Sequence, residues 1–177
     1  RDVPDAVGRA VPGVELRVID DDGNDLPQGE TGELWILSPA RLTGYLNQPD
    51  ATAEVLEDGW FKTGDLATIS PDGFVSIVGR KKDLILRGGY SVTAGEVEAV
   101  LMSHPDIAEA AVIGTPHADL GEEVAAYVAL RPNGTVTADD IIEFCKQRLA
   151  GYKYPRQVEI RPELPKGPTG KVIKARL

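Results

Sequence analysis

The pattern of apolar residues and turn signals changes once along the chain, close to residues 79–82. Before this point, short alternating apolar runs are separated by turn sequences, among them DDDGN at residues 20–24 and SPDG at residues 70–73. Such spacing is typical of antiparallel strands joined by tight turns, and it predicts an open or barrel-like β-layer over residues 1–79. Over residues 83–177, runs with helical spacing alternate with β-branched runs,. The sequence therefore predicts an α+β fold in two parts.

Period-two alternation gives the individual strands. We expect strands at residues 14–19, 32–37, 66–69 and 74–78 in the first part, with the SPDG turn joining the last two into a hairpin,. In the second part, we expect strands at residues 108–113, 124–130 and 158–160,.

Two helices of the second part are predicted by their start signals. Thr93 followed by Glu96 fits a capping box, in which each side chain satisfies a free backbone N–H of the helix start,. Thr137 is the second expected N-cap. The residues expected on the buried faces of these helices are Val97, Val100 and Leu101 in the first, and Ile141, Cys145 and Leu149 in the second,.

Composition restricts what the chain can bind. With 42% apolar residues it can bury a core, and its formal charge of −9 argues against nucleic acid as a partner,. A small anion can still be bound by local lysines and backbone N–H groups. Cys145 is the only cysteine, so no internal disulfide is possible. No apolar stretch reaches the ~20 residues that a membrane span needs, and we expect a cytoplasmic protein without a transmembrane segment.

Three stretches can carry chemistry, and each also has a simpler structural interpretation. In WFKTGDL (residues 60–66), Asp65 either makes a turn or offers a carboxylate that accepts hydrogen bonds from a vicinal diol such as ribose,. In GRKKDLILRGGY (residues 79–90), alternating charges suit a solvated linker, whereas the paired glycines allow a ligand to approach the backbone closely,. PKGPTGK (residues 165–171) is too short between its glycines for a phosphate-binding loop and suits a flexible turn, from which Lys171 can reach a neighbouring site,.

The remaining polar candidates are weaker. His104 precedes Pro105 at a helix end, where it caps the helix or is solvated,. His117 lies in a turn without a serine or cysteine partner at a recognisable spacing,. The acidic pairs at residues 122–123 and 139–140 have the pattern of solvated charges in a loop and at a helix start, and no metal-ligand cluster is visible,.

Taken together and in this order, the three stretches resemble the adenylate-forming superfamily, which comprises acyl-CoA synthetases, peptide-synthetase adenylation domains and beetle luciferases. The resemblance covers nearly the whole chain, and it includes VGRAVPGVE at residues 7–15, GETGEL at residues 29–34 and TGYL at residues 43–46. It implies that residues 1–79 are the β-rich end of a large N-terminal adenylation domain, that residues 80–82 are a hinge, and that residues 83–177 are a small mobile C-terminal α+β domain.

The resemblance also implies roles for matched positions. Asp65 and Arg80 match residues that hold the ribose of ATP and of the acyl-adenylate, and Lys171 matches the catalytic lysine that bridges the substrate carboxylate and the α-phosphate. A cation suits that place, because adenylation brings two anionic groups together. The implied substrates are a carboxylic acid, ATP and coenzyme A, and no residue of this chain is expected to bind a metal.

The hinge and the thioester-forming loop follow from the same resemblance. Lys82 matches the hinge position, which the family fills with Asp or Lys. Gly88, Gly89 and Tyr90 match the loop that lines the pantetheine channel. Rotation about Lys82 would present Lys171 for one half-reaction and the glycine loop for the other. The chain departs from the family at Ser91 and Ala94, where relatives often carry Asn and Pro.

The phosphate loop of the family, with the Mg²⁺ that accompanies ATP, and most of the acyl pocket are expected upstream of residue 1. We therefore expect these 177 residues to be inactive alone. LILRGGY at residues 84–90 resembles the corresponding strand of fatty or aryl acyl-CoA synthetases. The alternatives are an adenylation domain that loads a carrier protein, luciferase-like chemistry, and a degenerate relative without catalysis.

Overall fold

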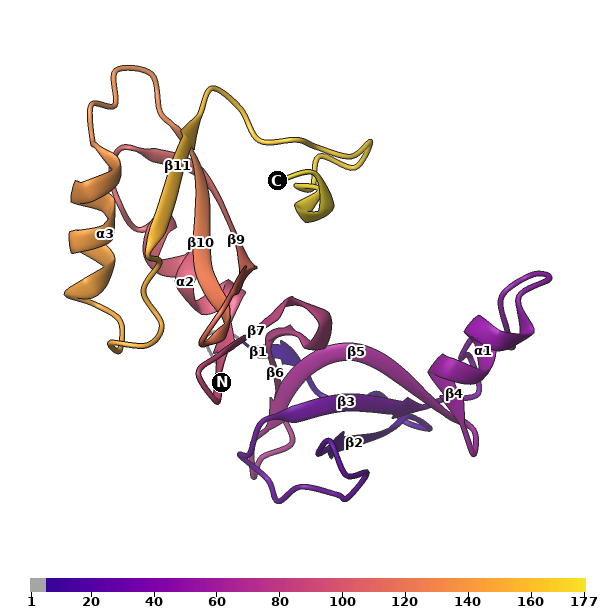
Figure 1. The fold of residues 1–177 in the computed structure, drawn as a ribbon. Coiled ribbons are helices and arrows are strands. Elements are labelled where there is room, and N and C mark those ends of the chain that lie inside the picture. The colour runs from indigo at the N-terminus through magenta and orange to yellow at the C-terminus, as the bar shows by residue number, and fades with distance from the viewer. Residues whose placement is uncertain (1–5) are drawn as a thin grey trace. The chain divides into compact units, whose positions relative to one another are not determined.

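The computed structural model describes residues 6–177, and the chain divides into two compact units (Figure 1). Unit 1 ends at Lys82, and unit 2 runs from Asp83 to Leu177. Both units are built on β-sheets, with one short helix in unit 1 and two longer helices in unit 2. The predicted α+β class is confirmed. None of the helices formed by residues 6–177 is both long enough and apolar enough to cross a membrane.

Unit 1 is an open antiparallel sheet with the strand order β1-β6-β5-β3-β2, and β4 pairs beside β5. A single short helix, α1, precedes β4. The bounds of these elements are β1 Ala6–Gly8, β2 Glu15–Ile19, β3 Gly32–Leu37, α1 Pro49–Val55, β4 Leu56–Glu57, β5 Trp60–Ile69 and β6 Val75–Arg80.

The SPDG turn joins β5 and β6 as predicted. The Gly73 N–H donates to the Ser70 carbonyl at 2.8 Å, and the Phe74 N–H donates to the Ser70 hydroxyl at 3.0 Å. Gly73 has a φ of 79°, a conformation that glycine adopts without the steric cost of a Cβ,. Strand β5 begins six residues before the predicted strand (residues 66–69), so the WFKTGD stretch belongs to the sheet.

Unit 2 is a five-stranded sheet between two helices and the C-terminal tail. The strand order is β11-β10-β7-β8, with β9 paired to β10. The bounds are β7 Leu84–Arg87, β8 Tyr90–Thr93, α2 Ala94–Met102, β9 Ile107–His117, β10 Gly121–Leu130, α3 Ala138–Lys146 and β11 Gln157–Arg161. Of two 3₁₀ turns, Lys81–Asp83 spans the boundary between the units and Lys174–Arg176 lies near the end of the chain.

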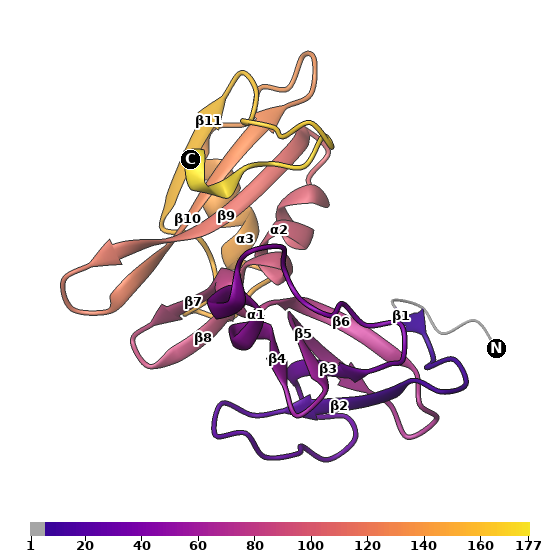
Figure 2. The ribbon, with the colours of Figure 1, turned by 90° about the vertical axis from the view of Figure 1, so that its right-hand side faces the viewer.

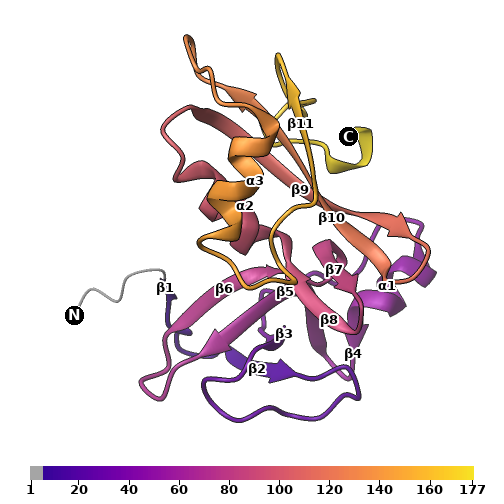
Figure 3. The same cartoon turned by 60° about the vertical axis from the view of Figure 1, so that its left-hand side comes forward.

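The two faces of the β9–β10 hairpin carry different layers. Val124, Ala126 and Val128 belong to the buried cluster that includes residues of α2 and α3, the helices that come forward in Figure 3. The alternate residues Tyr127 and Ala129 belong to a second cluster with Leu164 and other tail residues, which face the viewer in Figure 2. Alternation along one strand therefore holds the helices on one side and the tail on the other.

The predicted buried helix faces are largely confirmed, and Thr93 is an N-cap as predicted, but its predicted capping box is wrong. The residues expected on these faces are buried or partly buried, although Leu149 lies beyond the end of α3. Thr137 and Asp140 form a capping box at α3. Thr93 is the N-cap of α2, but its side chain makes no capping hydrogen bond. It is the last residue of β8, and the Glu96 carboxylate accepts hydrogen bonds from Lys153 Nζ instead.

Candidate functional site

Asp65 and Arg80 lie opposite each other on neighbouring strands of unit 1. Strand β5 pairs with β6 so that the two residues are in register, and Arg80 Nε lies 3.0 Å from Asp65 Oδ1. The Asp65 side chain is 28% exposed and the Arg80 side chain 55%. Two residues that are 15 positions apart in the sequence thus form one half-exposed carboxylate–guanidinium pair. Such a pair can accept and donate hydrogen bonds to the hydroxyl groups of one ligand.

Glu33 on β3 contacts the residues next to Asp65 and Arg80 in the sequence, and sequence reasoning missed it. One oxygen of its carboxylate accepts the Gly64 N–H at 3.2 Å, next to Asp65. The other oxygen lies 3.2 Å from Lys81 Nζ, next to Arg80. The side chain of Glu33 is only 11% exposed. A single carboxylate therefore contacts the backbone before Asp65 and the side chain of the lysine that follows Arg80.

Lys82 lies at the end of unit 1, in the 3₁₀ turn Lys81–Asp83, with an exposed side chain. The chain divides into its two units directly after this residue. The hinge role of Lys82 and the limits of the hinge at residues 80–82 stay predictions.

Gly88 and Gly89 form the tip of the β7–β8 hairpin in unit 2. Their φ values are 57° and 81°, and two successive positive values are what a tight two-residue hairpin turn requires. The Gly88 N–H donates to the Leu120 carbonyl at 2.8 Å. The ring of Tyr90 stacks on that of Tyr152, with centroids 4.5 Å apart. The predicted loop is thus an exposed backbone turn beside an aromatic pair.

The acidic pair Glu122 and Glu123, predicted to be solvated, belongs to strand β10. Glu123 is buried and forms a two-point ion pair with Arg87, whose Nε and Nη2 donate to its two oxygens at 2.5 and 3.1 Å. The Leu86 N–H donates to the Glu122 carboxylate at 2.7 Å. Burial is the largest influence and raises the pKa of Glu123, but hydrogen bonds from Arg87 and the Val124 N–H, with the charges of Arg87 and Arg156, lower it overall,. The two carboxylates thus hold β7, and with it the glycine turn, against β10.

PKGPTGK was expected to form a flexible turn, and Lys171 lies at the end of a hairpin in the C-terminal tail that backbone hydrogen bonds close. The Gly167 N–H donates to the Lys171 carbonyl at 2.9 Å, and the Gly170 N–H donates to the Gly167 carbonyl at 2.9 Å. Lys166 and Val172 form an antiparallel bridge across the base of the turn. The Lys171 side chain is exposed, and among residues 6–177 it has no hydrogen-bond or ion-pair partner. Its charge is therefore available to a ligand.

The other titratable candidates have local roles. The Nδ1 atoms of His104 and His117 accept the backbone N–H groups of Asp106 and Asp119, at 3.1 and 3.2 Å. Cys145 is fully buried, and burial raises the pKa of its thiol to about 11, so it packs in the core. Within residues 6–177, no group of three or more His, Cys, Asp or Glu side chains is placed to hold a metal ion.

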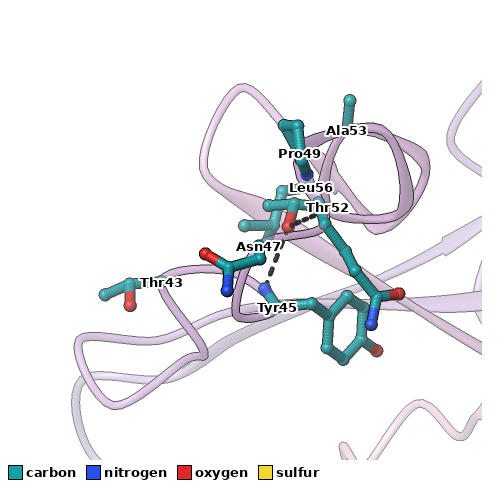
Figure 4. A pocket seen from close by; sticks show the side chains of 9 residues that line it. Thr43, Tyr45, Asn47, Pro49, Thr52, Ala53 and Leu56 are labelled. Atoms are coloured by element: carbon teal, nitrogen blue, oxygen red, sulfur yellow. Dashed lines mark hydrogen bonds between the residues drawn. The ribbon is translucent and has the colours of Figure 1, made fainter.

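An open cleft of about 490 Å³ lies between α1 and the loop before it, and none of the predicted site residues lines it (Figure 4). The Thr52 hydroxyl accepts the Tyr45 N–H at 2.9 Å and donates to the Gln48 carbonyl at 2.8 Å. These bonds, drawn as dashed lines in Figure 4, fasten the loop to the helix. The Thr52 hydroxyl thus serves the local fold.

Two family models match the chain. The model of the AMP-binding enzyme matches residues 1–46, and the model of the AMP-binding enzyme C-terminal domain matches residues 96–171. The chain is 44% identical over 172 residues to a long-chain-fatty-acid–CoA ligase of Yersinia pestis, with 97% of this chain and 30% of that protein covered. It is also 44% identical over 170 residues to the putative acyl–CoA ligase YdaB of Bacillus subtilis, with 96% and 34% covered.

Solved structures agree with the sequence relatives. ATP-bound MatB from Rhodopseudomonas palustris superposes with a TM-score of 0.92 at 39% identity, over 98% of this chain and 35% of that one. The o-succinylbenzoate CoA synthetase MenE of Bacillus subtilis, in complex with an acyl-adenylate intermediate, gives 0.89 at 32% identity, over 97% and 35%. The chain thus spans about a third of the length of the proteins it matches.

The fold, the two family matches and these relatives define the class of the protein. The chain belongs to the AMP-binding, adenylate-forming enzymes and is a piece of such an enzyme. The predicted family and the predicted fold of its C-terminal portion are confirmed.

Proposed function

We propose that the enzyme to which this chain belongs activates a carboxylic acid with ATP and transfers the acyl group to coenzyme A. In the first step, a carboxylate oxygen attacks the α-phosphorus of ATP, and the bond to pyrophosphate breaks. In the second step, the thiol sulfur of coenzyme A attacks the acyl carbon, loses its proton, and AMP leaves. The names of the relatives support fatty acids as substrates, and the LILRGGY stretch supports fatty or aryl acids.

The observation that carries the proposal is that Lys171 has no ion-pair partner among residues 6–177, whereas the two neighbouring lysines of the tail each pair with a carboxylate. Lys166 and Lys174 each lie within ion-pair distance of a carboxylate, whereas Lys171 at the hairpin end is exposed and unpaired among residues 6–177. In the proposed first step, the Lys171 ammonium bridges the attacking carboxylate and the α-phosphate. A positive charge there lowers the barrier, because two anions approach each other in the transition state.

The remaining site residues serve binding and the change between the two steps. We assign Asp65 to accept hydrogen bonds from the ribose hydroxyls and Arg80 to donate to the same ribose. The turn at residues 88–90 lines the path of the pantetheine arm in the second step, and Lys82 is the pivot between the two steps. The phosphates of ATP and their Mg²⁺ are assigned to the part of the enzyme outside this chain. ATP and coenzyme A are cytoplasmic metabolites, so we place the reaction in the cytoplasm.

The test is a half-reaction assay of the intact enzyme with Lys171→Ala. We expect acid-dependent release of pyrophosphate to fall roughly 100-fold or more, because the variant loses a preorganised charge at the reacting centre. Thioester formation from supplied acyl-adenylate and coenzyme A should stay within a factor of about three. Lys146→Ala, which changes an exposed lysine of α3, is the matched control. Normal pyrophosphate release by the Lys171→Ala enzyme would refute the assignment.

A carrier-protein substrate is the alternative acceptor. Assaying the second half-reaction with coenzyme A and with a pantetheinylated carrier protein separates the two, since only the accepted thiol yields a thioester. The 177-residue chain alone should show no substrate-dependent exchange between ATP and pyrophosphate.

A further inference from the structure

We propose that Lys174 is a positioning residue for Lys171, which it holds in place for the adenylate-forming step. This inference rests on the proposed function, because it concerns the position of the Lys171 ammonium in the adenylate-forming step. The observation behind it is that the tail carrying Lys171 is tied to unit 2 by charged contacts on both sides of the hairpin.

The tail holds three lysines within nine residues, and they have different surroundings. Lys166 Nζ lies 2.5 Å from the Glu109 carboxylate on β9. Lys174 Nζ lies 2.8 Å from Glu98 on α2 and 3.5 Å from Asp83. Lys171 lies between them in the sequence and is exposed. The two outer lysines therefore fasten the segment, and the inner one remains available.

The two attachments differ in strength. The Lys166–Glu109 pair is the more exposed, with 44% and 33% of the side chains accessible. At the second attachment, Lys174, Glu98 and Asp83 are 26%, 25% and 29% exposed, and one cation meets two carboxylates. Partly buried, multiply paired charges are screened less by solvent than exposed single pairs. Lys174 is thus the stronger of the two charged attachments.

Glu98 is itself fixed by the sheet. Its Oε1 atom, which faces Lys174, also accepts the Val112 N–H of β9 at 2.8 Å. Glu98 therefore connects α2, β9 and the tail at one point. Its position does not depend on Lys174, so the carboxylate offers the lysine a fixed partner.

The Lys174–Asp83 contact ties the tail to the residue next to the proposed pivot. It is the first residue of unit 2 and directly follows Lys82, the proposed pivot. Through Lys174, the segment carrying Lys171 is attached next to the point about which unit 2 would turn. A rotation of the unit then moves Lys171 along a defined path, because the tail cannot lag behind.

Apolar contacts hold the tail as well, but they are weaker on the side of the hairpin that follows Lys171. Leu164, before the hairpin, is 2% exposed and packs with Ala111 and Ala129. After the hairpin, Val172 and Leu177 are only partly buried against that cluster. Loss of Lys174 would therefore loosen this second side and leave the rest of the tail docked. Displacement of a catalytic group by about 1 Å can cost roughly 100-fold in rate.

The primary experiment is Lys174→Met in the intact enzyme, with Lys146→Met as the matched control on α3. Met keeps much of the length of the side chain and removes its charge. We expect pyrophosphate release to fall roughly 10- to 100-fold, thioester formation from supplied acyl-adenylate to change less than about three-fold, and Lys174→Arg to recover most of the loss. Equal losses in both half-reactions would show a merely structural role and overturn the proposal, as would full activity of Lys174→Met.

A double variant tests whether Lys174 acts through Lys171. Once Lys171→Ala has removed the ammonium, adding Lys174→Met should lower pyrophosphate release by less than about two-fold, because there is no charge left to position. If the loss of pyrophosphate release in the double variant equals the product of the losses in the two single variants, the inference is overturned.

Hydrogen exchange separates this inference from the proposed function. In Lys174→Met, the amides of Gly167 and Gly170, which close the hairpin, should exchange at least several-fold faster than in the Lys146→Met control. If Lys171→Ala proves harmless, the proposed function fails while faster exchange still shows the anchoring. If the Gly167 and Gly170 amides exchange at the same rate in Lys174→Met as in the control, Lys174 does not anchor the tail, whatever activities the variants have.

Discussion

The two units of the chain bury their apolar residues very differently. Unit 2 has a continuous core, in which Val97, Leu101, Ile107 and Ile141 are fully buried between the sheet and the two helices, and the tail covers the opposite face. In unit 1, the central buried cluster is limited to Leu34, Ala67 and Val75. Unit 2 thus has the layered core of an independent domain, whereas unit 1 is a sheet with a thin core.

The surfaces differ in the same sense. Both units expose apolar side chains, but the highest values lie in unit 1, with Val7 at 71%, Val11 at 64% and Leu46 at 87%, whereas the highest in unit 2 is 57%, at Leu86 and Tyr90. Where exposed apolar side chains lie together, they mark a face that packs against other protein. The relatives are about three times as long as this chain, and we expect such a face to be covered in the intact enzyme. We propose that unit 1 is part of a larger fixed body and that unit 2 moves as a rigid piece, and the difference between the two cores supports this proposal.

The largest expected difference in stability between the two units should appear when each is expressed alone. We expect residues 83–177 expressed alone to unfold cooperatively in urea, and residues 1–82 alone to show no cooperative transition, because the small core cannot offset the chain entropy. Circular dichroism followed through a urea titration measures both. A cooperative transition of residues 1–82, with a midpoint equal to that of residues 83–177, would break the comparison.

Truncation of one leucine in each core should give the next largest effect. In the 177-residue chain, Leu101→Ala should lower the stability of unit 2 by about 2–5 kcal/mol, because it leaves a cavity in a closed core. Leu34→Ala should cost unit 1 only about 1–2 kcal/mol, since the thin layer can collapse around the gap. Both tryptophans, Trp35 and Trp60, lie in unit 1, so tryptophan fluorescence reports unit 1, and helical circular dichroism mainly reports unit 2. Equal losses of stability in Leu101→Ala and Leu34→Ala would contradict the inferred difference between the two cores.

The sequence predicted well those elements whose signal is local. The SPDG turn requires a positive φ at Gly73, and the glycine supplies it whatever surrounds the hairpin,. Caps show where local signals stop being sufficient. Thr137 follows a loop and forms its capping box, whereas Thr93 carries a similar signal but ends a strand, so the ladder fixes its backbone and its side chain makes no cap. The same motif gives two outcomes because the preceding element differs.

Candidate site residues were found one by one, but their partners were not. Asp65 and Arg80 became a pair only through the register of β5 and β6. Glu123 was taken for a solvated charge, because its partner Arg87 lies 36 residues away and nothing local indicates their contact. Glu33 was missed for the same reason, since its contacts reach 31 and 48 residues along the chain. Side-chain chemistry can be predicted from local sequence, whereas ion pairs between distant strands depend on the completed fold.

Removing the charge of Glu123 from the buried Arg87–Glu123 pair, which again belongs to unit 2, should cost less than the Leu101→Ala truncation. The folded-state pKa of Glu123 is lowered from 4.5, so its ionised form stabilises the fold above about pH 4.5, and this contribution is lost as the pH falls through the folded pKa. Glu123→Gln should cost about 1.5–3 kcal/mol at pH 7, and its difference from the unchanged chain should narrow as the pH falls toward 3. Urea titrations at a series of pH values, followed by helical circular dichroism, measure this difference, and Glu143→Gln, at an exposed pair on α3, should be nearly neutral throughout. A difference in the free energy of unfolding that stays constant with pH would mean that the charge of Glu123 does not contribute to the stability of unit 2.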